Sequence, residues 1–141
     1  MNLSQHIVFK KNLPWKDLFE EMKSSMIGLH TMKDEHFGIV VVELMAAGLV
    51  TVAHNSAGPK LDIVGEEGES RGFLAESAQD FAKKILYVLD HYEDEKQMIQ
   101  LRNRARKHVQ MFSDQVFVQE YMKIFGSFIE KCYGTGRVKS D

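Results

Sequence analysis

The order of apolar and polar residues along this chain of 141 residues predicts β-strands that alternate with α-helices. Short apolar runs bounded by turn-forming residues are typical of buried strands. Such runs predict four strands, at residues 7–9, 26–30, 49–53 and 72–74. Apolar residues spaced three or four apart, together with capping residues, predict helices. The predicted helices lie at residues 15–23, 38–48, 59–64, 77–89, 94–111 and 113–132.

The segment 38–48 is open to two interpretations when only its residue types are considered. Residues 39–42 are β-branched, which favours a strand. Leu44 and Met45 follow with two alanines, and these are helix formers. Gly48 then stands where a glycine commonly ends a helix. We therefore expect a helix that starts near Gly38 and is buried, because it is apolar on all sides.

Strands that alternate with helices at this spacing predict an α/β fold with a parallel sheet covered on both faces. Ligands of such sheets bind at the carboxyl ends of the strands. The loops that follow His30 and Ala53 are expected at this edge, beside the start of the helix at 38–48. The sequence therefore places a candidate ligand site there.

Two acidic residues flank the start of this helix. Glu43 is the only ionisable residue between Phe37 and Ala53. A carboxylate buried without partners costs several kcal/mol, so such a residue is usually paired, protonated or directed at a polar ligand. Glu35 precedes the helix, with seven residues between it and Glu43.

The backbone between these two acids is suited to an anion. On the helical interpretation, the amides of Phe37, Gly38 and Ile39 lack intrahelical partners and point out of the helix start. Gly38 allows a phosphate to approach the backbone closely. A nucleotide sugar, anionic in the middle and rich in hydroxyls at both ends, has the matching layout. The spacing alone equally allows Glu43 to cap or pair within the core and Glu35 to be a solvated loop acid.

Composition narrows the class of protein. Hydrophobic residues make up 44% and charged residues 27%, which is ordinary for one globular domain. The 18 basic and 20 acidic residues nearly balance, so no overall charge favours nucleic acid as a partner. The single cysteine, Cys132, excludes an internal disulfide and suits a reducing compartment. We expect one domain over residues 1–133 and a flexible polar tail at 134–141.

Histidines and a basic run are further candidates. His30, His36 and His54 are expected near the sheet edge, but their spacing matches no zinc pattern, so we expect no metal site. His36 could instead donate a hydrogen bond to a phosphate, or be a core or solvated histidine. The basic run at 102–108 lacks interleaved aromatic residues and is interpreted as a solvated helix face.

These residues resemble a known family. Glu35 and Glu43 resemble the E-x7-E motif of the retaining GT-B glycosyltransferases, the glycogen-synthase-like group. A longer string is similar to the GDP-mannose-dependent α-1,2-mannosyltransferases that extend the dolichol-linked precursor of N-glycans. The string comprises residues 30–32, 35–39, 41–43, 45–48, 54–56, 58–64, 72–76 and 112–115. The likeness covers most of the chain from residue 7 to about residue 129.

The resemblance implies a Rossmann-like half of a GT-B C-terminal domain that uses GDP-mannose as donor. It implies that Glu35 is the catalytic residue, contacting the hydroxyls of the donor sugar, and that Glu43 holds the nucleotide ribose. His36 and the amides around Phe37, Gly38 and Ile39 would bind the diphosphate. It also implies no metal cofactor, a lipid-linked oligosaccharide as acceptor, and a location at the cytosolic face of the endoplasmic reticulum membrane.

Parts of the family pattern are not found in these 141 residues. They are the acceptor domain, a membrane-anchoring N-terminus and the first strand of the nucleotide domain. We therefore expect this chain to be the back half of a donor domain, with membrane association through segments it does not contain. Its last helix would pack on the absent lobe, which leaves Phe117, Phe125 and Phe128 exposed and favours aggregation. Ala57 stands where the pattern has a second glycine, which matters if the position requires a positive φ.

Two other functions remain open at this point. The chain could be a non-catalytic module that binds nucleotide sugars or a partner and has kept the fold. It could also belong to another GT-B transferase that uses a different nucleotide, because the residues that read the base are not identifiable in the sequence.

Overall fold

The core of the protein is a three-stranded parallel sheet with the strand order β1-β2-β3. The structure is a computed structural model and describes residues 3–65 and 71–133. The strands are β1 (Ile27–His30), β2 (Val50–His54) and β3 (Phe73–Ala75). Ile27 pairs with Val50, and Val52 pairs with Phe73. The expected α/β class with a Rossmann-like parallel sheet is confirmed.

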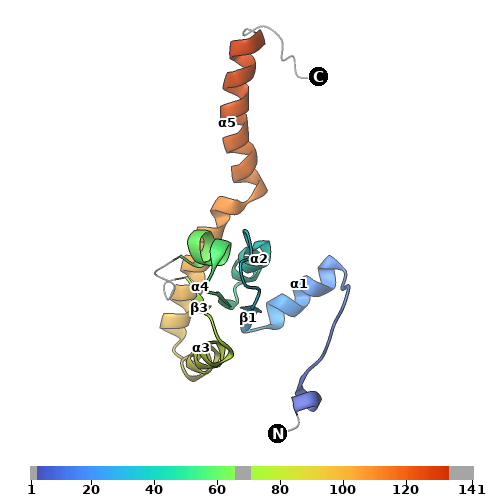
Figure 1. Ribbon diagram of the computed structural model, residues 1–141, viewed down its shortest axis with the longest axis vertical. Helices are drawn as coiled ribbons and strands as arrows, with labels where there is room; N and C mark the ends of the chain where they lie inside the picture. Colours follow the sequence, from blue (N-terminus) through green and yellow to red (C-terminus); the bar gives the residue numbers. More distant parts are fainter. Residues whose placement is uncertain (1–2, 66–70, 134–141) are drawn as a thin grey trace.

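Helices follow each strand and extend beyond the sheet (Figure 1). The α-helices are α1 (Trp15–Ser24), α2 (Ile39–Ala47), α3 (Ala78–Asp90), α4 (Glu95–Val109) and α5 (Asp114–Tyr133). The short helices are η1 (Leu3–His6), η2 (Pro59–Val64) and η4 (Gln110–Phe112). All six helices predicted from the sequence are present, with ends that differ by a few residues. The predicted polar tail at 134–141 lies outside the described residues.

Helix α2 forms for the reasons that its sequence suggested. Both Gly38, with φ of 98°, and Gly48, with φ of 95°, have the left-handed backbone that glycine adopts without strain. The N–H of Gly48 donates to the carbonyl groups of Leu44 and Met45 and so closes the last turn. The expectation of complete burial is wrong, because Ile39 is 54% and Val40 is 42% exposed at the first turn.

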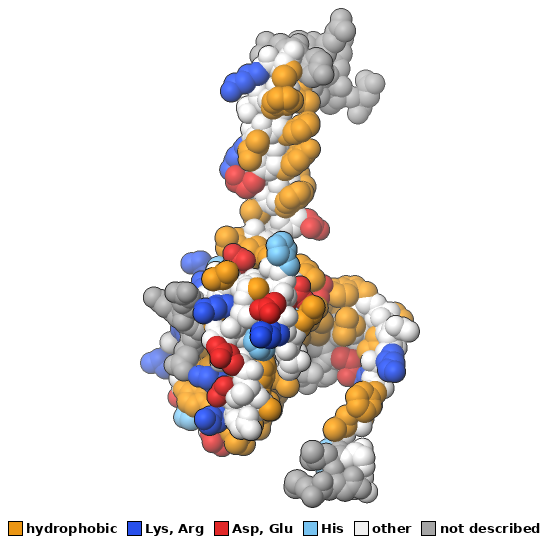
Figure 2. All heavy atoms as spheres, in the orientation of Figure 1, with side chains coloured by type: hydrophobic (Ala, Val, Ile, Leu, Met, Phe, Trp, Pro, Cys, Tyr) orange, Lys and Arg blue, Asp and Glu red, His pale blue; other side chains and the backbone are white. Residues whose placement is uncertain are grey.

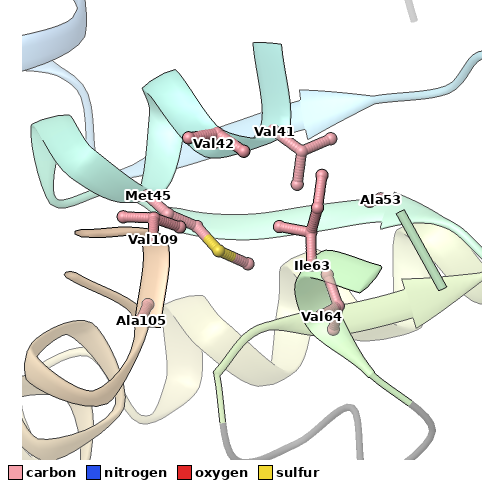
Figure 3. Close-up of a cluster of buried hydrophobic side chains, with 8 residues drawn as sticks. All are labelled: Val41, Val42, Met45, Ala53, Ile63, Val64, Ala105 and Val109. Carbon is pink, nitrogen blue, oxygen red and sulfur yellow. The ribbon is translucent and has the colours of Figure 1, made fainter. Parts of the chain in front are cut away.

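The two faces of β2 pack into separate cores. One core joins α2, η2 and α4 on one side of the sheet (Figure 3). It consists of Val41, Val42, Met45, Ala53, Ile63, Val64, Ala105 and Val109. On the other side, Val50 and Val52 pack with residues of β3, α3 and α4. Successive residues of β2 point to opposite faces, so its uniform apolar sequence matches a strand buried on both sides.

Two strand predictions are corrected by the structure. Residues 7–9 form no strand, and Phe9 is 85% exposed. Their apolar run has strand propensity, but no neighbouring strand pairs with it, and an unpaired strand is not stable. The apolar run at 26–30 also predicts a buried strand, and this is wrong for one face of β1, since Leu29 is 49% exposed. In this structure β1 is the edge of the sheet, and its second face is covered only in part, because Ile27 packs against the core around Val50 while Leu29 does not.

Helix α5 projects away from the rest of the domain (Figure 1). Its apolar side chains form a stripe along the helix that is open to solvent (Figure 2). The expected exposure is confirmed: Phe117 is 67%, Phe125 43% and Phe128 56% exposed. None of the helices among the described residues combines the length and apolar character needed to cross a membrane.

Candidate functional site

The loops after β1 and β2 are joined by two hydrogen bonds at the carboxyl edge of the sheet, one of which has a side-chain acceptor. The N–H of Gly58 donates to the carbonyl oxygen of Glu35 at 3.0 Å. The N–H of Asp34 donates to the hydroxyl oxygen of Ser56 at 2.8 Å. These two bonds fix the backbone on both sides of the segment that leads into α2.

Gly58 is required by this contact. A Cβ atom added to Gly58 would lie 2.3 Å from the carbonyl oxygen of Phe37 and 2.4 Å from that of His36. Both atoms belong to the backbone, so a larger residue would separate the two loops. The sequence alone did not single out Gly58. Glycine is needed there because of a contact with a segment more than twenty residues away in the chain.

Several backbone positions in these loops have a left-handed conformation. Asp34 has φ of 56° and Ala57 has φ of 42°. Aspartate is tolerated there, whereas alanine is not favoured. Ala57 stands where the family pattern has a glycine, and the structure shows that this position does have a positive φ.

The start of α2 presents free backbone N–H groups. Gly38 precedes the helix, and no side chain in the described part of the chain caps it. The first N–H groups that reach a helical carbonyl are those of Val41 and Val42, which both donate to Gly38 O. The preceding amides, including those of Gly38 and Ile39, are thus placed as an anion site requires.

Glu35 lies beside this helix start and is largely enclosed. Its side chain is 27% exposed, and one carboxylate oxygen lies 3.7 Å from Nε2 of His30. The Cγ atom of Glu35 would be 3.5 Å from a Cβ atom on Gly38. Glu35 is therefore not the fully solvated loop acid that the sequence left open.

Glu43 lies on the open side of α2. It is half-buried, and the residues one turn on either side of it, Ile39 and Ala46, are exposed. Among the described residues, no hydrogen bond or ion pair to its carboxylate is found. The structure thus gives no support to a Glu43 that is paired within the core. Its proposed role toward a ligand remains a prediction.

The other predicted site residues differ in their environments. His36 is exposed, so its side chain is available to a ligand. Phe37 is half-buried and packs edge-on against Phe112, with ring centroids 5.2 Å apart. Its side chain therefore anchors the loop to the core, and only its backbone could serve a ligand.

The side chains of His54 and Ser56 support the loops. Nδ1 of His54 lies 2.8 Å from the hydroxyl of Ser56. That hydroxyl oxygen also accepts the N–H of Asp34, so its proton is free to be donated to His54. The sequence indicated only that Ser56 lies in a loop. Its contacts depend on how the two loops meet in the fold.

A nearby hollow is separate from the two acids. It has a volume of about 240 Å³ and lies between the end of β3 and the start of α3. Asn55 and Glu76 line it and are joined by a hydrogen bond of 2.7 Å. Neither Glu35 nor Glu43 lines it, and we assign it no function.

The described residues contain no group of three or more histidine, cysteine or acidic side chains placed to hold a metal ion. His30 and His54 instead contact Glu35 and Ser56. The expectation that no metal is needed is not tested by this finding and stays a prediction.

The basic run on α4 makes structural contacts. Arg106 donates to the carbonyl of Ala47 at the end of α2, at 3.1 Å. Nε2 of His108 lies 3.1 Å from the carbonyl oxygen of Asp62. Arg104, Arg106 and Lys107 are exposed, which agrees with the interpretation of the run as a solvated helix face, although Arg106 and His108 also contact the backbone of neighbouring elements.

Comparison with known proteins identifies the family. Residues 1–108 match the family model described as "Glycosyl transferases group 1". A Homo sapiens protein named "GDP-Man:Man(3)GlcNAc(2)-PP-Dol alpha-1,2-mannosyltransferase" is 45% identical over 134 residues, 94% of this chain and 26% of that protein.

Relatives that carry the same name have similar identities to this chain and are covered by it to a similar extent. The Mus musculus protein is 46% identical over 118 residues, 83% of this chain and 24% of the relative. The Dictyostelium discoideum protein is 37% identical over 131 residues, 93% of this chain and 25% of the relative. The chain thus spans about a quarter of the length of these curated relatives. Since the family match covers well over half of the chain, the chain belongs to the group 1 glycosyl transferases.

Proposed function

We propose that this chain is the donor-binding part of a GDP-mannose-dependent α-1,2-mannosyltransferase that acts on a dolichol-linked oligosaccharide. The names of the relatives support this donor and acceptor. The structural observation that carries the proposal is the uncapped start of α2, with Glu35 enclosed beside it.

Each part of the donor has a group suited to it. The amides of Phe37, Gly38 and Ile39 bind the diphosphate, with His36 as a further donor. Oriented N–H groups stabilise the charge that develops on the leaving diphosphate. Glu35 accepts hydrogen bonds from the mannose hydroxyls and is the catalytic residue of this proposal. Glu43 accepts hydrogen bonds from the ribose.

The remaining parts of the reaction belong to segments outside this chain. The acceptor binds mainly to the portion of the longer relatives that these 141 residues do not span. Membrane association and a location at the cytosolic face of the endoplasmic reticulum follow from the dolichol-linked acceptor. The transfer is expected to need no metal ion. The chain alone is therefore expected to bind the donor without turning it over.

The test is a titration of the chain with GDP-mannose, GDP and UDP by calorimetry or NMR. We expect GDP-mannose and GDP to bind and UDP to bind more weakly. Glu43→Ala should weaken the binding of both GDP and GDP-mannose by about 10-fold or more. The reason is that a hydrogen bond to a charged group contributes about 1.5–3 kcal/mol. Glu35→Ala should weaken the binding of GDP-mannose and leave the affinity for GDP unchanged.

Glu130→Ala, on exposed α5, is the matched control and should bind like the unaltered chain. Equal affinity for UDP and GDP would indicate a different transferase of the family. Absence of binding to every nucleotide would contradict the proposal for this chain. Mannosyl transfer by a longer product that contains the chain would distinguish the enzyme from a non-catalytic binding module.

A further inference from the structure

His30 is a buried histidine at the end of β1, and the proposed function gives it no role. Its side chain is 9% exposed. It points to the same face of β1 as Gly28, whose Cα hydrogens face Leu44 of α2. A histidine in this place is thus enclosed between the sheet and α2.

The two ring nitrogens of His30 have different surroundings. Nε2 lies 3.7 Å from Oε2 of Glu35, which is within ion-pair distance. Nδ1 is buried and has no hydrogen-bond partner among the described residues. A buried polar atom without a partner is unfavourable, so packing alone would be served better by an apolar side chain.

The contact with Glu35 indicates a role for the His30 ring. An ionised carboxylate only accepts hydrogen bonds, so the ring must carry its proton on Nε2 to interact favourably with Glu35. The β1 strand that carries His30 is paired with β2 along its length, from Ile27 to His30. The ring is thus attached to a strand that is hydrogen-bonded into the sheet.

The backbone around Glu35 is already fixed by other contacts. Its carbonyl is held by Gly58, and the preceding N–H of Asp34 is held by Ser56. What these bonds leave undetermined is the direction of the Glu35 carboxylate. Among the described residues, the ring of His30 is the basic group that lies within 4 Å of that carboxylate, at 3.7 Å.

We propose that His30 is a positioning residue: its Nε2–H holds one oxygen of Glu35 so that the other oxygen is directed at the donor sugar. This inference rests on the proposed function for the role of Glu35, but the contact itself is independent of any ligand. Preorganised side chains contribute to binding because the ligand does not have to order them.

The first experiment needs no ligand. Ring ¹⁵N and ¹H signals of His30 are recorded in the unaltered chain, in Glu35→Ala and in Glu43→Ala. We expect a ring proton on Nε2 and a clear shift of both ring nitrogen signals in Glu35→Ala only. A proton on Nδ1 alone, or unchanged His30 signals in Glu35→Ala, would overturn the inference whatever the chain binds.

The second experiment separates positioning from packing. His30→Gln places an amide N–H near the position of Nε2, whereas His30→Leu fills the space without a donor. We expect His30→Leu to weaken the binding of GDP-mannose several-fold, because the Glu35 carboxylate is no longer oriented by the ring, and to leave the binding of GDP unchanged. His30→Gln should restore most of the GDP-mannose affinity.

Equal losses for GDP and GDP-mannose in both variants would indicate a merely structural role and overturn the inference. Circular dichroism and the melting temperature show whether each variant has kept its fold. If the unaltered chain binds no nucleotide, the proposed function fails while the His30 signals still test the contact. The two failures are therefore distinguishable.

Discussion

The amide of Gly58 donates its hydrogen to the carbonyl oxygen of Glu35 across 3.0 Å, which joins the loop after β2 to the loop after β1. The two residues are far apart in the sequence, and each belongs to a different strand connection. This bond sets where the backbone of Glu35 lies relative to the start of α2. Gly58 thus holds the backbone of the residue proposed to meet the sugar, while the direction of its carboxylate depends on other contacts.

Gly58→Ala is expected to destabilise the protein by about 2 kcal/mol or more, because overpacking against a rigid backbone forces the two loops apart. The melting temperature of the variant measures this loss. Gly126→Ala is the matched control, since a Cβ atom there meets nothing within 4 Å. It should be neutral or stabilising by up to about 1 kcal/mol, because alanine favours the helix. A Gly58→Ala variant as stable as Gly126→Ala would contradict the contact.

Ala57→Gly is expected to stabilise the protein. The φ of 42° at Ala57 lies in the left-handed region, which costs an L-residue roughly 1–2 kcal/mol, whereas glycine adopts it freely. After the entropy cost of glycine, we expect a net gain of about 0.5–1 kcal/mol. Ala46→Gly, at an exposed helical position of α2, should lose about 1 kcal/mol. Denaturant unfolding measures the change in the free energy of unfolding for both variants. A change of the same sign in both would contradict the prediction.

The exposed stripe of α5 is expected to cause self-association. Phe117, Phe125 and Phe128 are each more than 40% exposed, and contiguous apolar surface of this kind promotes aggregation. Replacing all three by Gln should raise the monomer fraction in gel filtration and reduce binding of a hydrophobic dye. Gln119→Ala with Ser127→Ala, on the polar side of the helix, should change neither. A stable, monodisperse monomer for the unaltered chain would contradict this prediction.

The capping box of α3 is expected to make stability depend on pH in the acid range. The Ser77 hydroxyl, and then its backbone N–H, donate to the Asp80 carboxylate and hold the pKa of Asp80 below its ordinary value of 3.8. The folded state therefore binds fewer protons than the unfolded state in this range. The stabilisation is present above pH 3.8 and is lost as the pH falls through the lower folded-state pKa.

Ser77→Ala should lower the melting temperature by about 2–4 °C at pH 7, the effect of losing one N-cap side chain. The difference from the unaltered chain should become smaller below pH 3.8. Ser113→Ala removes the side-chain cap at Val116 of α5, which has no carboxylate partner, and so its effect should not depend on this carboxylate. A pH-independent difference for Ser77→Ala would contradict the pKa assignment.

Local chemistry made much of the fold predictable. Glycines at both ends of α2 and the Ser77–Asp80 pair mark helix ends through contacts that reach only a few residues. The run at 7–9 shows the limit of such reasoning. Its residues favour a strand, yet whether a strand forms depends on a partner that local sequence cannot supply.

The sequence by itself determined the order of the helices and of three strands, and the family-like spacing of Glu35 and Glu43. These depend on periodicity, capping and motif, which are properties of short segments. Only the tertiary structure decided that Gly58 holds Glu35, that Ala57 is strained and that His30 contacts a carboxylate. The physical reason is that these contacts join the ends of different strands, and their geometry exists only after the sheet has brought those ends together.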